Sequence, residues 1–388
     1  MIESQDPLIF ETKEKKRKKI IFSILGVIIF CLVGIGLSME IRHIRSRISI
    51  YTPITTPTPT PDPMAPKNVL LLGYGGAGHD GGLLTDTMIL AHVIPKEKKV
   101  VLISIPRDLW VPMEVRVGTA SAYKINAAFA IGSDDKAYQK KPQKYQGDKG
   151  GLMMAEDAVE TITGLPVDFA VAIDFSGFSK IIKTLGGIFI DVPYAFEDKL
   201  YPVKGLEKET CGKSEEDLAK TIATLSGQLL EQEFPCRYET LKFEKGKQFM
   251  DGDLALKFVR SRHSDVNGGD FGRSLRQQAF LLGVKNRLLS FASATKIIPL
   301  FKDGLGMVNT DFSYQDGVTM LERYGSISSY SMDSIFLTDQ TILTFATSSD
   351  RQSILIPKTG EGDWDSVHAY ITRELTRISE STKSAVVQ

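Results

Sequence analysis

The chain has 388 residues, of which 42% are hydrophobic and 24% are charged, a balance that excludes an intrinsically disordered protein. This length is enough for one extended α/β domain with appendages. The 47 basic and 47 acidic residues cancel, so there is no overall positive field to attract nucleic acid, and any anion site must be built locally. We therefore expect no nucleic-acid partner.

The N-terminal part predicts a membrane anchor. Residues 1–19 end in a run of lysine and arginine, and residues 20–39 carry no charge and would cross a ~30 Å hydrocarbon layer as a helix. A cleaved signal peptide would need a shorter apolar core and a small-residue cleavage site. Because the larger basic cluster precedes the span, we expect a cytoplasmic N-terminus, a single-pass cell-membrane protein and a main domain outside the cell.

The anchor is followed by a juxtamembrane segment and a Thr/Pro-rich spacer, together residues 40–66, which predicts an extended linker. The folded domain is expected over residues 67–380, with a disordered tail at 381–388. Cys211 and Cys236 are its only cysteines. In an exported domain these two cysteines can form a disulfide or remain as free thiols, and the sequence does not decide between the two.

Residues 67–72 predict a buried strand that leads into a glycine-rich loop beginning at Gly73. The loop has the GxGxxG spacing of a dinucleotide site, but such a site needs a helix at the third glycine, and here residues 87–93 predict another strand. A dinucleotide site is therefore excluded. Asp86, at the end of the loop, is a candidate ligand for a hard cation, and an Asx-type turn residue is the alternative.

A third strand is predicted at residues 99–105, joined to the second by a turn and followed by Pro106 and Arg107. At the edge of a sheet Arg107 is a candidate ligand contact, with a surface ion pair as the alternative. Lys124 and Asn126 stand in an otherwise small and apolar run, and we count them as candidate ligand-binding residues.

Strands and helices then alternate, which predicts a three-layer α/β/α sandwich with a central mixed sheet, preceded by the transmembrane helix. The expected helices are residues 151–163, 175–187, 251–259, 292–303, 313–324 and 365–378, and the further strands are 167–173, 188–192 and 335–338. Residues 194–242 show no regular pattern, and we interpret them as an insertion over the sheet.

Residues 259–278 concentrate donors for an anion. This stretch contains four arginines: Arg260, Arg262, Arg273 and Arg276. A helix that begins near Phe271 would place Arg273 and Gln277 on one face, because they are four residues apart. Guanidinium groups bind phosphate in a fork geometry, so a phosphate site is predicted. The alternative is a solvated basic helix with surface ion pairs.

Together these motifs resemble the LytR-CpsA-Psr family of cell-envelope proteins. The resemblance runs from about residue 67 to about residue 289 and rests on LLLG with the glycine loop and DTM, then SIPRD, KIN, VRSRH and GGDFGRSLRQQ. It implies a membrane-anchored phosphotransferase that moves a glycopolymer from a polyprenyl pyrophosphate carrier to a peptidoglycan hydroxyl, with Mg²⁺ and several arginines at the pyrophosphate. The positions that match the family's functional residues are Asp86, Arg107, Arg260, Arg262, Arg273 and Gln277.

Two positions depart from the family pattern. Gly75 stands where the family has an aspartate, and Leu84 stands where it has an arginine. One metal ligand and one phosphate contact are therefore missing from their usual places. Asp80 or His79, in the same loop, are candidates for the missing ligand, so the expected metal residues are Asp86 and Asp80.

The residues are also suited to this chemistry without the family name. Displacement at a pyrophosphate requires neutralisation of charge on its oxygens, which arginine groups and a divalent ion supply without a covalent nucleophile. Among the positions that match the family, the resemblance implies Arg107, Arg273 and Asp86 as the catalytic residues. Asp108 and Asp270 are candidate general bases, and either is equally a carboxylate that orients an arginine. The alternative functions are a non-catalytic binding protein or regulator of lipid-linked wall polymer, and a pyrophosphate-cleaving hydrolase on the same substrate.

Overall fold

The computed structural model describes residues 62–78, 81–290, 307–324 and 329–386. The expected cytoplasmic tail and membrane span, most of the spacer, Asp80 and the expected helix at 292–303 lie outside these residues. Within the described ranges, no helix combines the length and the apolar character that a membrane crossing requires.

The centre of the fold is a six-stranded mixed sheet with the strand order β11-β6-β1-β2-β3-β12. Its strands are β1 (Lys67–Tyr74), β2 (Thr85–Ile94), β3 (Lys99–Ser104), β6 (Phe169–Asp174), β11 (Asn309–Thr310) and β12 (Ser331–Phe336). β2 is antiparallel to β1 and β3, whereas β6 is parallel to β1 and β12 is parallel to β3. The expected mixed sheet is confirmed. The antiparallel pairing of β1 and β2 also agrees with excluding a dinucleotide-binding unit.

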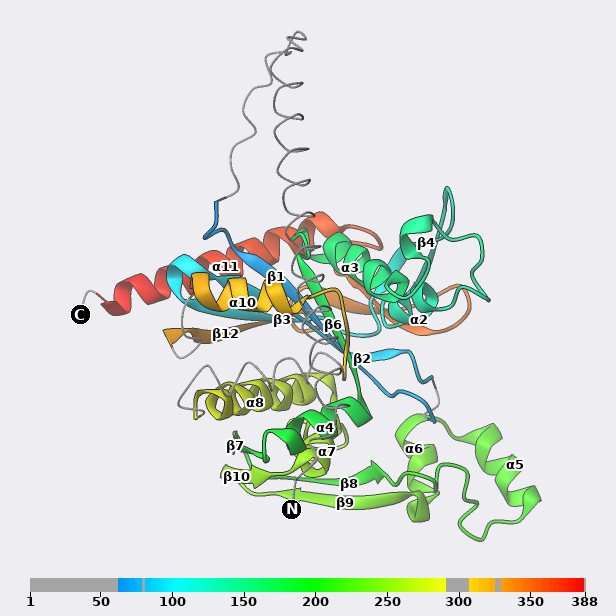
Figure 1. Ribbon diagram of the computed structural model, residues 1–388. Coiled ribbons are helices and arrows are strands. Elements are labelled where there is room, and N and C mark those ends of the chain that lie inside the picture. Colours follow the sequence, from blue (N-terminus) through cyan, green and yellow to red (C-terminus); the bar gives the residue numbers. More distant parts are fainter. Residues whose placement is uncertain (1–61, 79–80, 291–306, 325–328, 387–388) are drawn as a thin grey trace, which may run out of the picture. The chain divides into compact units, whose positions relative to one another are not determined.

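Helices cover both faces of this sheet (Figure 1). One face packs against α2 (Ala127–Ser133), α3 (Gly150–Thr163) and α11 (Trp364–Val386), and the other faces α4 (Phe175–Thr184), α7 (Gly252–Arg260) and α8 (Gly269–Leu289). Side chains alternate between the faces along each strand. In β1, Leu70 and Leu72 join the large core on the first face, and Val69 and Leu71 point to the second. Three further helices of the described chain are α10 (Tyr314–Tyr324), which follows β11 and precedes β12 in the sequence, and the short η1 (Pro95–Glu97) and η2 (Gln143–Tyr145).

A further β layer lies beyond α4, α7 and α8 and corrects the interpretation of residues 194–242 as an insertion (Figure 1). It consists of two antiparallel pairs, β7 (Ile188–Val192) with β10 (Gly246–Met250) and β8 (Phe196–Pro202) with β9 (Tyr238–Phe243). Phe196 and Phe243 are buried in one core with α7. Both ends of the supposed insertion are thus core strands. Each strand is short and has polar or charged residues at its exposed positions, so its alternation of buried and exposed residues is not evident from the sequence.

Two more hairpins flank the sheet. They are β4 (Trp110–Arg116) with β5 (Thr119–Lys124), and β13 (Leu343–Thr347) with β14 (Ser353–Pro357). The Leu355 backbone nitrogen donates to the Asp108 carbonyl at 2.9 Å, which fixes the second hairpin beside the end of β3. At the C-terminus, the backbone of α11 continues as helix to Val386, beyond the buried Ile378.

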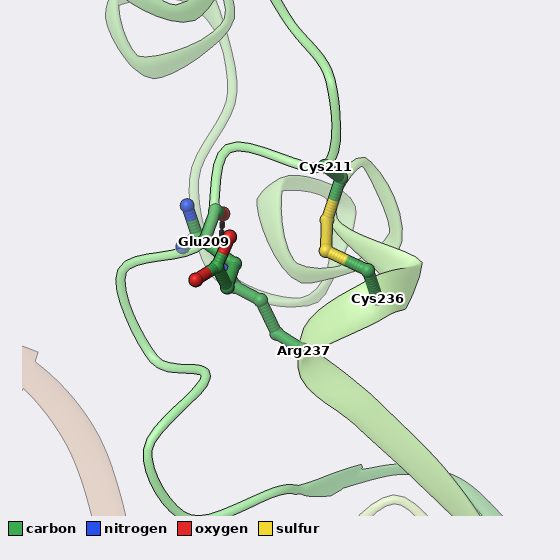
Figure 2. The surroundings of a disulfide bond; sticks show 4 residues. All are labelled: Glu209, Cys211, Cys236 and Arg237. Atoms are coloured by element: carbon green, nitrogen blue, oxygen red, sulfur yellow. Dashed lines mark hydrogen bonds between the residues drawn. A yellow bond between two sulfur atoms is a disulfide. The ribbon is translucent and has the colours of Figure 1, made fainter.

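Residues 203–237, between β8 and β9, form a separate lobe that carries α5 (Glu215–Thr224), α6 (Gly227–Gln232) and η3 (Pro235–Arg237). A disulfide joins Cys211 to Cys236, which resolves the open alternative in favour of a bond (Figure 2). The Arg237 Nε donates to the Glu209 carbonyl at 2.6 Å beside it. Neither α5 nor α6 buries a residue. The disulfide and the buried Phe234 therefore hold this lobe together in place of a core of its own.

Candidate functional site

An apolar cavity of about 270 Å³ separates the second face of the sheet from the helices above it. The strands contribute Leu71, Ile89, Val171 and Ile173, and the helices contribute Phe178, Ile181, Phe280, Leu281 and Val284. Leu71, Val171 and Ile173 are only half-buried although they lie between two layers. They face empty volume where closely packed atoms would be usual. A cavity of this character suits a hydrocarbon chain.

A second, polar cavity of about 420 Å³ adjoins the first. Thr87 and Gln277 line both cavities. The Gln277 Nε2 donates to the Thr87 Oγ1 at 2.8 Å, which joins α8 to β2 at the boundary. Charged residues on the wall of the polar cavity are Asp86, Asp108, Arg262, Arg273 and Asp339. The two cavities together suit a ligand with an apolar chain and an anionic head.

Arg273 and Gln277 share one face of α8, as the sequence predicts. Each is only 7% exposed, and both line the polar cavity. The alternative of a solvated basic helix is therefore wrong for this face. A guanidinium group with little access to water interacts more strongly with an anion than an exposed one does, because the local dielectric is lower.

Arg276 does not line either cavity and instead supports the structure. It is fully buried, its Nη2 donates to the Ser261 carbonyl at 2.5 Å, and its Nη1 donates to the Ser264 Oγ at 3.2 Å and the Tyr194 hydroxyl at 3.3 Å. Burial lowers the pKa of Arg276. This arginine ties the loop at residues 261–268 to α8.

The same loop is fixed by a residue that the sequence analysis missed. Asp198 of β8 is 1% exposed, and its Oδ2 accepts from the Ser261 Oγ at 2.7 Å and the Arg262 backbone nitrogen at 3.0 Å. At the other end of the loop, a Cβ on Gly272 would lie 1.4 Å from the Asn267 carbonyl oxygen, so only glycine fits. Arg262 is therefore presented by a loop that is held from two sides.

Arg107 and Asp86 form an ion pair at the edge of the polar cavity. The Arg107 Nη1 donates to the Asp86 Oδ1, and the Arg107 Nε lies 3.6 Å from the Asp108 Oδ2. The Lys124 Nζ donates to the Asp108 Oδ1 at 2.7 Å. Each carboxylate oxygen of Asp108 thus faces a cation, which favours an orienting role over that of a general base. The side chain of Asp270, the other candidate base, lies outside the described side chains.

Three predicted ligand-binding residues lie elsewhere. Lys124 pairs with Asp108 without lining the polar cavity, and the Asn126 backbone nitrogen donates to the Arg107 carbonyl at 3.2 Å, so that Asn126 joins neighbouring segments. Arg260 lies beside the apolar cavity and a separate groove of about 1070 Å³. Its Nη1 donates to the Tyr201 hydroxyl at 3.1 Å, and its guanidinium lies 4.0 Å from the Phe175 ring centroid. The four arginines of this stretch therefore do not form one cluster.

The described residues contain no group of three or more His, Cys, Asp or Glu side chains that could hold a metal ion. Asp86 alone fits the mode in which Mg²⁺ binds one or two carboxylates together with substrate phosphates. Asp174, at the end of β6, is a carboxylate beside the glycine loop, because a Cβ on Gly76 would lie 2.9 Å from the Asp174 Cβ. Its Oδ1 caps α4 by accepting from the Gly177 nitrogen at 2.6 Å.

The fold is a mixed α/β domain in which an apolar cavity and a polar cavity adjoin. The sequence matches the LytR_cpsA_psr family over residues 42–356, and the chain belongs to this family.

Similar proteins include two that are named polyisoprenyl-teichoic acid–peptidoglycan teichoic acid transferases. TagV of Bacillus subtilis is 28% identical over 70% of this chain and 56% of its own length, and TagU of Bacillus licheniformis is 26% identical over 78% of this chain and 81% of its own. The chain thus spans little more than half of TagV. Among solved structures, that of B. subtilis TagV has a TM-score of 0.52 at 23% identity and covers 81% of this chain and 98% of its own. A Streptococcus agalactiae protein has a TM-score of 0.54 at 22% identity and covers 80% of this chain and 88% of its own. These likenesses support the fold.

Proposed function

We propose that this protein transfers a glycopolymer from a polyprenyl pyrophosphate carrier to a hydroxyl group of peptidoglycan. The observation that carries the proposal is the junction of the two cavities at Thr87 and Gln277. The isoprenoid chain occupies the apolar cavity, and the pyrophosphate lies beside Arg262 and Arg273. The names of the relatives as teichoic acid transferases support the same class of reaction.

In this reaction the acceptor oxygen attacks the phosphorus that carries the glycan. The bond from that phosphorus to the polyprenyl phosphate oxygen breaks, and the acceptor proton passes to water or a nearby carboxylate. The products are a glycan phosphodiester on peptidoglycan and polyprenyl monophosphate. Arg262, Arg273 and Gln277 donate to the phosphate oxygens, and the charge that develops on the leaving group is neutralised without a covalent intermediate.

Magnesium belongs to this proposal as a substrate-dependent ion. Asp86 would hold it together with phosphate oxygens, and the ion would supply positive charge to the pyrophosphate. Asp86 also accepts from Arg107, so this carboxylate sets the position of a second cation at the cavity edge. Arg107 is then a positioning and charge-neutralising residue of the same site.

A second function is binding of lipid-linked polymer without turnover, and Gly75 and Leu84 favour it because two charged groups of the family pattern are absent there. For either function we propose a membrane-anchored chain with the folded domain outside the cell. The disulfide supports export, because disulfides persist in oxidising compartments.

Titration of polyprenyl pyrophosphate analogues tests the proposed site. Affinity is expected to rise with the length of the isoprenoid chain until the apolar cavity is filled, because each buried CH₂ group contributes about 0.8 kcal/mol. A monophosphate of equal chain length should bind more weakly, because it offers fewer oxygens to the arginines. Equal affinity for short and long chains would contradict the assignment of the apolar cavity.

The same titration tests the metal. We expect Mg²⁺ to bind weakly or not at all without the analogue and to strengthen analogue binding when it is present. Asp86→Ala should abolish this gain, because it removes the anion that balances the ion. In a mechanism without metal, the same change would remove a negative charge beside the phosphates and tighten binding. Tighter binding by Asp86→Ala, with no effect of a chelator, would show that the arginines act alone.

A further inference from the structure

Three phenylalanine rings line the polar cavity, where charged groups would suffice for a phosphate. They are Phe271 at the start of α8, Phe336 at the end of β12 and Phe345 in β13. Phe345 is 65% exposed and Phe271 is 44% exposed, and the ring centroids of Phe271 and Phe336 are 5.1 Å apart. Exposed aromatic surface at the wall of a cavity is typical of a ligand-binding site.

The backbone places Phe345 near the predicted reaction centre. Phe345 is opposite Leu355 in the β13–β14 register, and the Leu355 nitrogen donates to the Asp108 carbonyl at 2.9 Å. Two inter-strand spacings, about 10 Å, therefore separate the backbone of Phe345 from the segment that carries Arg107 and Asp108. A ligand of the size of one sugar ring, bound in the cavity that both Phe345 and Asp108 line, can therefore reach both.

Polar side chains accompany the rings. Asp339 and Gln340, from the connection between β12 and β13, line the same cavity and are exposed. This connection is fixed by hydrogen bonds, because the Thr338 nitrogen donates to the Thr341 Oγ1 at 2.9 Å and the Lys358 Nζ donates to the Thr341 carbonyl at 2.8 Å. The backbone of this connection is therefore held in place before a ligand arrives, which lowers the entropy cost of binding.

We propose that these residues form the subsite for the acceptor, in which a pyranose ring of the peptidoglycan glycan stacks on Phe345 and Phe271. A sugar ring has an apolar C–H face for the aromatic rings and hydroxyl groups at its edge for Asp339 and Gln340. A phosphate would be repelled by Asp339, and an isoprenoid chain gains more in the apolar cavity. The inference rests on the proposed function and names the site from which the acceptor hydroxyl attacks.

The test measures glycan binding and transfer separately, with the full chain in detergent. The binding probe is uncrosslinked peptidoglycan glycan strands without donor. Phe345→Ala is expected to weaken binding about tenfold, as loss of one stacking partner would, and Phe345→Trp should restore it. Phe249→Ala is a matched control, since Phe249 is 54% exposed in β10 and does not line the polar cavity. It should bind glycan as the wild type does, and unchanged melting temperatures will show that all variants fold.

In transfer, Phe345→Ala should raise the KM for glycan strands by a similar factor and leave the KM for the lipid-linked donor unchanged. An increase in the donor KM alone would place the sugar of the donor on the rings and overturn the assignment to the acceptor. Absence of glycan binding by the wild type, or equal binding by Phe345→Ala, would also overturn it. A wild type that binds glycan strands but transfers nothing would contradict the proposed function while leaving this subsite supported.

Discussion

Arg273→Ala is expected to reduce transfer by an amount that corresponds to about 2–5 kcal/mol of transition-state stabilisation. The physical reason is its position, since Arg273 is 7% exposed, lines the polar cavity and lies on the same helical face as Gln277. The free energy of unfolding should change less than the activity, because Arg273 lines the polar cavity instead of packing within one of the hydrophobic cores.

Initial rates at saturating donor and the midpoint of urea unfolding are the two measurements. Arg287→Ala is a control from the same helix, because Arg287 donates to the Leu185 carbonyl at 2.7 Å and lines neither cavity. It should transfer at the wild-type rate. If Arg273→Ala loses stability and activity in parallel, the arginine is structural and the pyrophosphate assignment is wrong.

Arg276→Ala is expected to show the opposite profile, with a loss of about 3–5 kcal/mol in the free energy of unfolding. Removing this side chain leaves the Ser261 carbonyl without its donor and empties the space beside the Phe196 ring, whose centroid lies 4.8 Å from the guanidinium carbon. Arg276→Lys should recover only part of the loss, because an ammonium group cannot reproduce the planar fork.

Urea unfolding of the wild type and both Arg276 variants measures this effect. A wild-type unfolding midpoint for Arg276→Ala would mean that the loop at residues 261–268 is held without it. In that case Asp198 would be the residue that holds Arg262 in place, and Asp198→Ala by itself should detach the loop at residues 261–268.

Local patterns in the sequence are sufficient for part of the site. Arg273 and Gln277 share a face because a helix places residues four apart side by side, and this depends on no other segment. The strands β1, β2 and β3 can likewise be predicted from the sequence, because each is a short apolar run bounded by turn residues. The family motifs identify Arg107 and Asp86 as separate candidate residues. They do not predict the ion pair between them, because that contact depends on the register of β2 and β3.

Other features depend on tertiary packing that no local pattern contains. Arg260 and Arg262 are two residues apart but face different cavities, because α7 ends at Arg260 and the chain turns at Ser261. Asp198 anchors Arg262 from a strand more than sixty residues earlier. The apolar cavity exists because α4, α7 and α8 stand away from the second face of the sheet, and an apolar residue that lines a cavity has the same sequence signature as one in a packed core.

Transfer in a defined mixture distinguishes glycopolymer transfer from hydrolysis and from binding without turnover. The full chain is incubated with a polyprenyl pyrophosphate-linked glycopolymer, uncrosslinked peptidoglycan and Mg²⁺, and the polymer on peptidoglycan and the released polyprenyl monophosphate are both quantified. We expect equal molar amounts of the two products and the loss of both in Arg273→Ala. Release of polyprenyl phosphate with no polymer on peptidoglycan would indicate a hydrolase, and a donor that remains bound and intact would indicate a binding protein; either result would contradict the proposed transfer.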